Sequence, residues 1–267
     1  MEEMSFADGT ILSYRSAGTG IPLLLLHAPL IGHVNFVAQK PLEDRFRLII
    51  PDLPGHGASS SLSEPYPLSV LARKLCELIR RSVKEKTIVC GYSQGGSLAL
   101  ACLLAEPELF AGGVLVSGFS EVDDLYLHSR FYMAEAMVRL HGTRLLASSI
   151  TSSHLDDPAA IQLWLEHMKK TDSDSLLRLY QAGHLYNCSS QLSAITSPLL
   201  LLYGEEDHPM QRYANKIKEH VPHAHLHYVP GVKHQIVTKA AHTFHEHLDL
   251  FAKEITTERT LILSNGR

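Results

Sequence analysis

Residues 87–106 read TIVCGYSQGGSLALACLLAE, and the rest of the chain is organised around this stretch. Its first four residues are apolar or β-branched, which is typical of a buried strand. From Gln94 onward, small and apolar residues follow at helical spacing until Pro107. The turn between them, residues 91–95, has the pattern G-x-S-x-G, in which glycines avoid steric clashes where the chain reverses. We therefore expect Ser93 at a sharp strand-to-helix turn, with its hydroxyl exposed beside a helix N-terminus.

The composition is that of an ordinary globular protein. The chain has 267 residues, of which 45% are hydrophobic and 19% are charged, and this is enough for one large α/β core. A net charge of −4 provides no basis for binding nucleic acid or an anionic membrane surface, and no apolar run approaches the length of a membrane span. The first residues lack the basic and apolar regions of a signal peptide. We therefore expect a cytoplasmic protein that acts on a small-molecule substrate, and we leave open whether it forms a homodimer.

Strand-like and helix-like segments alternate along most of the chain. Short runs that are typical of strands occur at residues 11–15, 22–26, 46–50, 87–90, 113–117, 198–203 and 225–229. Most are separated by segments with helical periodicity, which favours a mostly parallel, doubly wound α/β sheet. We therefore divide the chain into an α/β core, residues 1–119 and 193–267, and an inserted helical cap, residues 120–192, in which only helical patterns occur. We expect the cap to cover the carboxyl edge of the sheet, where such sheets bind ligands.

Two later segments provide partners for Ser93. A serine hydroxyl is a weak nucleophile, and it needs a base within hydrogen-bond reach, normally a histidine that a carboxylate holds in one tautomer. Asp207 and His234 each follow a predicted strand, so we expect both near the carboxyl edge of the sheet. Glu205 and Glu206 lie beside Asp207, and either is an alternative for the acid. The alternative for the motif itself is a glycine-rich turn of some other doubly wound protein.

Five segments resemble the motifs of the α/β-hydrolase fold superfamily, in the family's order and at plausible spacing. They are LLLLHAP (residues 23–29), PDLPGHGAS (51–59), GYSQGG (91–96), LLLYGEEDHPM (200–210) and PGVKHQI (230–236). The resemblance is to the cap-bearing branch of esterases, lipases and C–C bond hydrolases. It implies an α/β-hydrolase fold with Ser93 as nucleophile, His234 as base and Asp207 as acid. It also implies that the backbone N–H of Gln94 is one donor of the oxyanion hole.

The loop after the strand at residues 22–26 departs from the family pattern. The family usually has His-Gly-x there, and the residue after the glycine donates its backbone N–H to the oxyanion. That residue is here Pro29, which has no N–H. We therefore assign the second oxyanion donor to the N–H of Leu30, with a side-chain donor as the alternative. Losing one donor altogether would lower the rate by about 10²–10³.

The resemblance implies acyl transfer to water as the reaction. A serine at position 93 argues against haloalkane dehalogenase and epoxide hydrolase chemistry, because those relatives carry an aspartate there. Some apolar side chains of the cap should line an acyl pocket, so we predict a small, fairly apolar carboxylic ester as substrate. The candidates are Phe131, Tyr132, Met133, Met137, Trp164, Leu165 and Tyr180. The alternatives are C–C bond hydrolysis or a lyase reaction on the same triad, and a hydrolase-like receptor that turns over slowly or not at all.

The sequence indicates neither a cofactor nor a metal site. No G-x-G-x-x-G motif follows the first strand, which argues against a dinucleotide cofactor. The histidines of the segment HAHLH (residues 223–227) alternate along one predicted strand, so zinc binding is one interpretation. We prefer a solvated strand face, because no cysteine or further ligand pattern accompanies them. We expect His27, Asp52 and His56 to support their loops.

Overall fold

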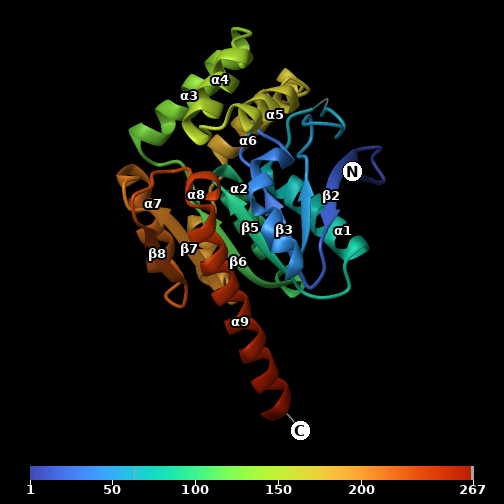
Figure 1. Ribbon diagram of the computed structural model, residues 1–267, viewed down its shortest axis with the longest axis vertical. Coiled ribbons are helices and arrows are strands. Elements are labelled where there is room, and N and C mark those ends of the chain that lie inside the picture. The colour runs from blue at the N-terminus through green and yellow to red at the C-terminus, as the bar shows by residue number, and fades with distance from the viewer. Residues whose placement is uncertain (63, 266–267) are drawn as a thin grey trace.

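The computed structural model describes the backbone of residues 1–62 and 64–265 and the side chains of residues 1–62 and 64–257. Within these residues, eight strands form one sheet in the order β1-β2-β4-β3-β5-β6-β7-β8 (Figure 1). Strands β1 and β2 pair in antiparallel fashion, β2 is antiparallel to β4, and the pairs from β4 to β8 are parallel. The strands are β1 Glu2–Ser5, β2 Ile11–Ala17, β3 Ile21–Leu26, β4 Phe46–Pro51, β5 Thr87–Tyr92, β6 Phe110–Val116, β7 Leu199–Gly204 and β8 His225–Val229. The predicted doubly wound, mostly parallel sheet is confirmed.

Helices cover both faces of this sheet, as the neighbours of two successive residues of β6 show. A Cβ on Gly112 would approach Phe251 and Ile255 of α9 (Ala241–Asn265), whereas a Cβ on the next residue, Gly113, would approach Leu103 of α2 (Gln94–Ala105). Successive residues of a strand point to opposite faces, so α2 and α9 lie on opposite sides of the sheet. Burial on both sides explains why the central strands are continuous apolar runs rather than alternating ones.

Two groups of helices complete these layers. Helix α1 (Leu68–Ser82) packs against α2, and the 3₁₀ segment η1 (His33–Asp44) packs against α8 (Ile236–Lys239) and α9. The remaining elements of the core are the short 3₁₀ turns η2 (Pro107–Leu109) and η3 (Ser189–Ala194), and helix α7 (His208–His220).

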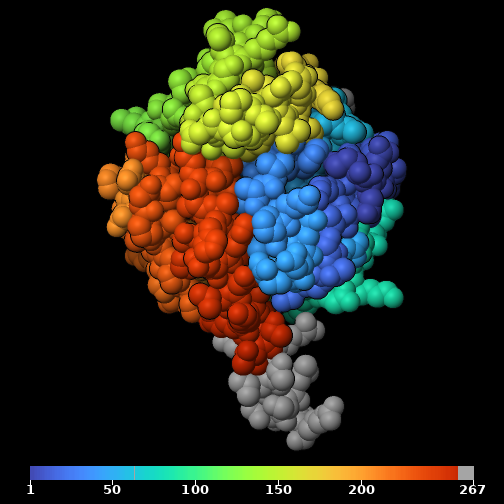
Figure 2. All heavy atoms as spheres, in the orientation of Figure 1, coloured from blue at the N-terminus to red at the C-terminus, as the bar shows by residue number. Residues whose placement is uncertain are grey.

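The segment between β6 and β7 is helical, and no strand is described between residues 120 and 192. Its helices are α3 Leu125–Arg139, α4 Thr143–His154, α5 Pro158–Met168 and α6 Ser173–Leu185. Helices α3, α5 and α6 begin after aspartates whose carboxylates accept N–H groups of the first turn, which stabilises those starts: Asp124, Asp157 and Asp172. In the space-filling view the green-to-yellow segment forms a layer at one end of the molecule (Figure 2).

The two ends of this helical segment lie side by side. Ser120 accepts a hydrogen bond from the N–H of Cys188 at 2.9 Å, and its hydroxyl is 2.8 Å from that of Ser189. An insertion whose ends meet can be accommodated without changing the sheet around it. Its division from the core as a separable cap stays a prediction.

The structure also contains features that the sequence patterns did not predict. The short, largely exposed strand β1 extends the sheet beyond β2, and four residues with no apolar run provide too little signal for such an edge strand. The segment after the first parallel strand is the 3₁₀ segment η1, with Pro41 inside it, instead of an α-helix. Among the described residues, no helix is long and apolar enough to cross a membrane.

Candidate active site

Ser93 occupies a strained turn between β5 and α2. Its backbone has φ 54° and ψ −123°, a left-handed conformation that a residue with a side chain rarely adopts. The flanking glycines permit this turn, because a Cβ on Gly91 would lie 2.0 Å from the carbonyl oxygen of Gly95, and a Cβ on Gly95 would lie 2.1 Å from that of Leu26. The G-x-S-x-G pattern therefore has a steric cause at each glycine.

Three side chains from different strand ends form one hydrogen-bonded line. The Nε2 atom of His234 is 3.0 Å from the Oγ atom of Ser93, and its Nδ1 atom is 2.8 Å from the Oδ2 atom of Asp207. A carboxylate only accepts, so Nδ1–H donates to Asp207 and a neutral His234 presents Nε2 as an acceptor for the Ser93 hydroxyl. The two alternative acids, Glu205 and Glu206, are exposed, whereas Asp207 is buried against the histidine. The arrangement is that of a serine with an adjacent base.

The oxyanion side differs from the prediction for Leu30. The Leu30 N–H donates to Nε2 of His56 at 2.9 Å, and both groups are buried. An N–H that already has a buried acceptor is not free for a substrate oxygen, so Leu30 is not an available oxyanion donor in this arrangement. The Gln94 N–H belongs to the first residue of α2, where N–H groups have no acceptor within the helix. Pro29 and Gln94 both line one small cavity, so they face the same space.

His27 and His56 support the loops around this space, and both ring nitrogens of each are used. Nε2 of His27 accepts the N–H of Leu53 at 2.9 Å, and its Nδ1 is 2.8 Å from the carbonyl oxygen of Ala28. His56 likewise accepts the Leu30 N–H at Nε2 and places Nδ1 against two backbone carbonyl oxygens. Burial lowers the pKa of His27 to about 3 and lowers the pKa of His56, so both remain neutral.

The cap-side helices contact residues beside Ser93 through two buried hydrogen bonds. The hydroxyl of Tyr92, the residue before Ser93, lies 2.7 Å from Nε2 of His154 on α4, whose pKa burial lowers to about 4. The Gln94 amide donates to the carbonyl oxygen of Leu179 on α6 at 2.6 Å. Sequence reasoning missed both contacts, since His154 and Leu179 carry no motif and lie more than sixty residues from their partners.

A third polar contact links α5 to the core at Asp52. Nε2 of His167 is 3.1 Å from Oδ1 of Asp52, and the backbone N–H and Nδ1 of His33 bind the same carboxylate at 2.7 and 2.9 Å. Burial would raise the pKa of Asp52, but the hydrogen bonds from His167 and His33 more than offset this and hold it below its ordinary value. Asp52 therefore joins its own loop to the segment after β3 and to α5.

The aromatic and apolar side chains predicted to line a pocket are divided between the interior and the surface. Trp164, Phe131 and Tyr180 are buried, whereas Tyr132 and Met133 are exposed. Tyr132 lines a cavity of about 1080 Å³ between α1, α2, α3 and α6, whose lining does not include Ser93. The cavity beside Gln94 has no room for a water molecule, and its lining also does not include Ser93. That lining is mostly apolar: His27, Pro29, Leu53, Leu68, Gln94, Gly95, Leu98 and Leu179.

The three histidines of residues 223–227 do not converge on one point. His225 pairs with Glu254 at 3.3 Å, the ring of His227 packs against that of His247, and Nε2 of His223 contacts the carbonyl oxygen of Ser197. Each has its own separate neighbour. His225 and His227 lie on the exposed face of β8, whereas His223 lies in the turn before that strand, outside the strand face that the sequence pattern predicted.

Comparisons with known proteins agree with this architecture. A model of the alpha/beta hydrolase family matches residues 23–254. The chain is 26% identical to a putative non-heme haloperoxidase of Mycobacterium phage D29, over 88% of this chain and 80% of that protein. It is 27% identical to a pimeloyl-[acyl-carrier protein] methyl ester esterase of Nitrosomonas europaea, over 82% and 90%. The solved structure of an esterase from Exiguobacterium antarcticum superposes with a TM-score of 0.84 at 20% identity, covering 94% of this chain and 98% of that one.

Proposed function

This chain belongs to the alpha/beta hydrolase family, and we propose from its site geometry that it hydrolyses a small, fairly apolar carboxylic ester through an acyl-enzyme on Ser93. One observation supports this proposal above all others. The imidazole of His234 lies between the Ser93 hydroxyl and the Asp207 carboxylate, at 3.0 and 2.8 Å, so a base and its orienting acid are in reach of the nucleophile.

In the proposed mechanism, each residue has one role. Ser93 Oγ attacks the ester carbonyl carbon as His234 Nε2 takes its proton, and Asp207 stabilises the imidazolium that forms. The oxyanion accepts a hydrogen bond from the backbone N–H of Gln94. His234 then returns the proton to the leaving alcohol, and a water molecule repeats the sequence on the acyl-enzyme to release the acid.

The class of substrate follows from the cavity beside Gln94. Leucines at positions 53, 68, 98 and 179 surround it. Its one titratable lining residue is His27, which is neutral because burial lowers its pKa. In this structure the space has no room for a water molecule, so it supports an apolar environment beside Gln94 without setting the size of the acyl group.

Replacement of the nucleophile tests the proposal. We expect Ser93→Ala to lower hydrolysis of p-nitrophenyl acetate and butyrate by at least about 10³-fold, because the attacking oxygen is lost. Ser97→Ala, four residues later in α2, is the matched control: it loses one hydrogen bond to the carbonyl oxygen of Phe119 but no reacting atom, so activity should persist. An organophosphate should label Ser93, as mapped by mass spectrometry. Labelling of another residue with Ser93 unmodified would contradict the assignment.

One observation favours a second candidate, a hydrolase-like receptor with slow turnover. With the Leu30 N–H donated to His56, one backbone donor, that of Gln94, remains assigned to the oxyanion. Release of at most one alcohol per chain, with no further turnover of any ester in the panel below, would favour this receptor, since a burst alone is also expected of an acyl-enzyme. Linear turnover would favour the enzyme. A panel of esters, lactones and vinylogous diketones would separate ester from C–C bond cleavage.

A further inference from the structure

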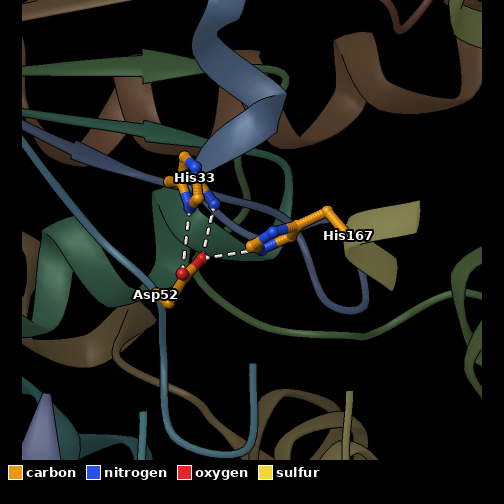
Figure 3. A group of neighbouring side chains, drawn as sticks. All are labelled: His33, Asp52 and His167. Atoms are coloured by element: carbon orange, nitrogen blue, oxygen red, sulfur yellow. Dashed lines mark hydrogen bonds and ion pairs between the residues drawn. The ribbon is translucent and has the colours of Figure 1, made fainter. Parts of the chain in front are cut away.

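His33, Asp52 and His167 come together from three separate elements. His33 begins η1, Asp52 directly follows β4, and His167 lies in the last turn of α5. The Nδ1 atom of His33 and the Nε2 atom of His167 lie 2.9 and 3.1 Å from the two oxygens of Asp52. Figure 3 shows both rings directed at the one carboxylate. This cluster is separate from Ser93, Asp207 and His234, and the proposed ester hydrolysis does not use it.

The cluster is nearly enclosed, with one edge toward solvent. The side chains of Asp52 and His167 are 1% and 8% exposed, whereas that of His33 is 21% exposed. Two glycines leave it room, because a Cβ on Gly32 would lie 2.2 Å from Nε2 of His167, and a Cβ on Gly57 would lie 2.2 Å from Oδ2 of Asp52. Both glycines have positive φ, 77° and 55°, so the backbone is shaped around these side chains.

Convergence distinguishes this cluster from the other histidine clusters. In the part of the chain that the structure describes, it is the one group of three His, Cys, Asp or Glu whose ligand atoms all lie within 4.8 Å of one another. The three residues His128, His184 and Glu135 also contact each other, but His184 binds one neighbour through Nε2 and the other through Nδ1, so they form a chain.

We propose that His33, Asp52 and His167 bind a zinc ion, with His33 Nδ1, His167 Nε2 and one Asp52 oxygen as ligands. Two imidazoles and a carboxylate are a zinc ligand set, and bonds of about 2.1 Å at tetrahedral angles place ligand atoms about 3.4 Å apart. His33 Nδ1 lies 2.9 Å from one Asp52 oxygen and His167 Nε2 lies 3.1 Å from the other. Ligand atoms taken one from each residue all lie within 4.8 Å of one another, so modest side-chain shifts bring three ligands to the separations that zinc needs.

Such an ion would hold α5 against the loops that follow β3 and β4. Two of its ligands belong to the core and the third to the helical segment, so zinc would stabilise the contact between them. Because binding to the folded state alone raises stability, saturating zinc should raise the melting temperature of the full chain by roughly 5 °C.

The test uses the full-length chain, stripped with a chelator and then titrated with zinc chloride alone. We expect one zinc per chain by equilibrium dialysis with elemental analysis, and a visible spectrum of four-coordinate cobalt(II) when cobalt replaces zinc. His33→Gln and His167→Gln should each weaken binding by at least about 100-fold, since even loss of a group supporting a ligand weakens it 10–100-fold.

His184→Gln is the matched control. It also removes a partly buried, carboxylate-bonded histidine from the helical segment, but it leaves the three proposed ligands in place. It should keep full zinc stoichiometry and the zinc-dependent rise in melting temperature. Binding of less than about 0.1 zinc per chain by the wild type would overturn the proposal, and so would equal binding by wild type and His167→Gln. The zinc stoichiometry and the melting temperature are both measured without esterase activity, so failure of the proposed function would not affect either result.

Discussion

Ser93 keeps its strained backbone because its neighbours hold it from both sides. Its N–H donates to the carbonyl oxygen of Val116 on β6 at 2.9 Å, and its own carbonyl oxygen accepts the N–H of Gly96 at 2.8 Å. The turn is therefore fixed between the sheet and the first turn of α2. Since the backbone cannot relax, the hydroxyl stays within 3.0 Å of His234 before any substrate binds, which is the pre-organisation that nucleophilic catalysis needs.

Replacing the proposed acid should distinguish the role of Asp207 from those of Glu205 and Glu206. We expect Asp207→Asn to lower kcat for p-nitrophenyl butyrate by about 10³–10⁴-fold, because a neutral amide neither holds the His234 tautomer nor stabilises its charge. Glu206→Gln is the control, since that side chain is exposed, and it should stay within about threefold of the wild type. A damaging Glu206→Gln together with a mild Asp207→Asn would reassign the acid.

Restoring an N–H at position 29 should speed the reaction. Pro29 shares the small cavity with Gln94, and Pro29→Ala adds a backbone donor where the family pattern carries one. We expect kcat to rise between about tenfold and 10²-fold with little change in KM, because the added donor acts mainly on the oxyanion. Pro222→Ala, at an exposed site, controls for a general effect of losing a proline. An unchanged kcat in a folded Pro29→Ala variant would show that this N–H does not reach the oxyanion.

Among the secondary-structure elements, α4, α5 and α6 each reach the core through a buried polar contact. These contacts are His154 with Tyr92, His167 with Asp52, and the Leu179 carbonyl oxygen with Gln94. Hydrogen bonds are directional and depend on distance, so these contacts define the position of the helical segment more narrowly than apolar packing alone.

Loss of one of these contacts should loosen the helical segment selectively. Tyr92→Phe removes the hydroxyl that His154 accepts and leaves a buried nitrogen unpaired, at a cost of about 1–3 kcal/mol of unfolding free energy. We expect faster proteolysis within residues 120–192 under native conditions. Tyr203→Phe is the matched control, because its buried hydroxyl donates to the carbonyl oxygen of Gly118 inside the core. It should cost a similar free energy, measured by urea unfolding, without faster cleavage in that segment. Equal cleavage of the two variants would contradict the prediction.

Over the whole molecule, buried neutral histidines make the fold sensitive to acid. Burial lowers the pKa of His27 to about 3 and that of His154 to about 4, whereas both titrate near 6.5 when unfolded. Between these values the unfolded chain binds more protons than the native one. The stability that depends on the neutral histidines is therefore fully present above pH 6.5 and is lost progressively as the pH falls below it.

This linkage predicts the size of the loss. Each of the two histidines should lower the free energy of unfolding by about 2 kcal/mol between pH 7.5 and pH 5, measured by urea unfolding followed by circular dichroism. His154→Gln still accepts from Tyr92 but does not titrate, so it should remove about half of that combined loss. His242→Gln, at an exposed site, should leave the pH dependence unchanged. A free energy that stays constant from pH 7.5 to pH 5 would contradict this account.

The sequence by itself determined the elements of this protein and the order of its candidate site residues. Apolar runs and helical periodicity act over a few residues. The strands from β2 to β8 were therefore predicted close to their observed positions, and residues 120–192 were predicted to be helical. The turn at Ser93 was also predictable, because a side chain at either flanking glycine would collide with backbone atoms. At Gly91 those atoms belong to Gly95, and at Gly95 they belong to Leu26 on the neighbouring strand β3.

Only the tertiary structure decided which groups meet across long separations in the chain. The Leu30 N–H has an acceptor because His56, 26 residues away, brings a neutral nitrogen to it. Tyr92 meets His154 across 62 residues, and Asp52 meets His167 across 115. No local pattern encodes such pairs, because each depends on how helices pack over the sheet and on the rotamers that this packing allows.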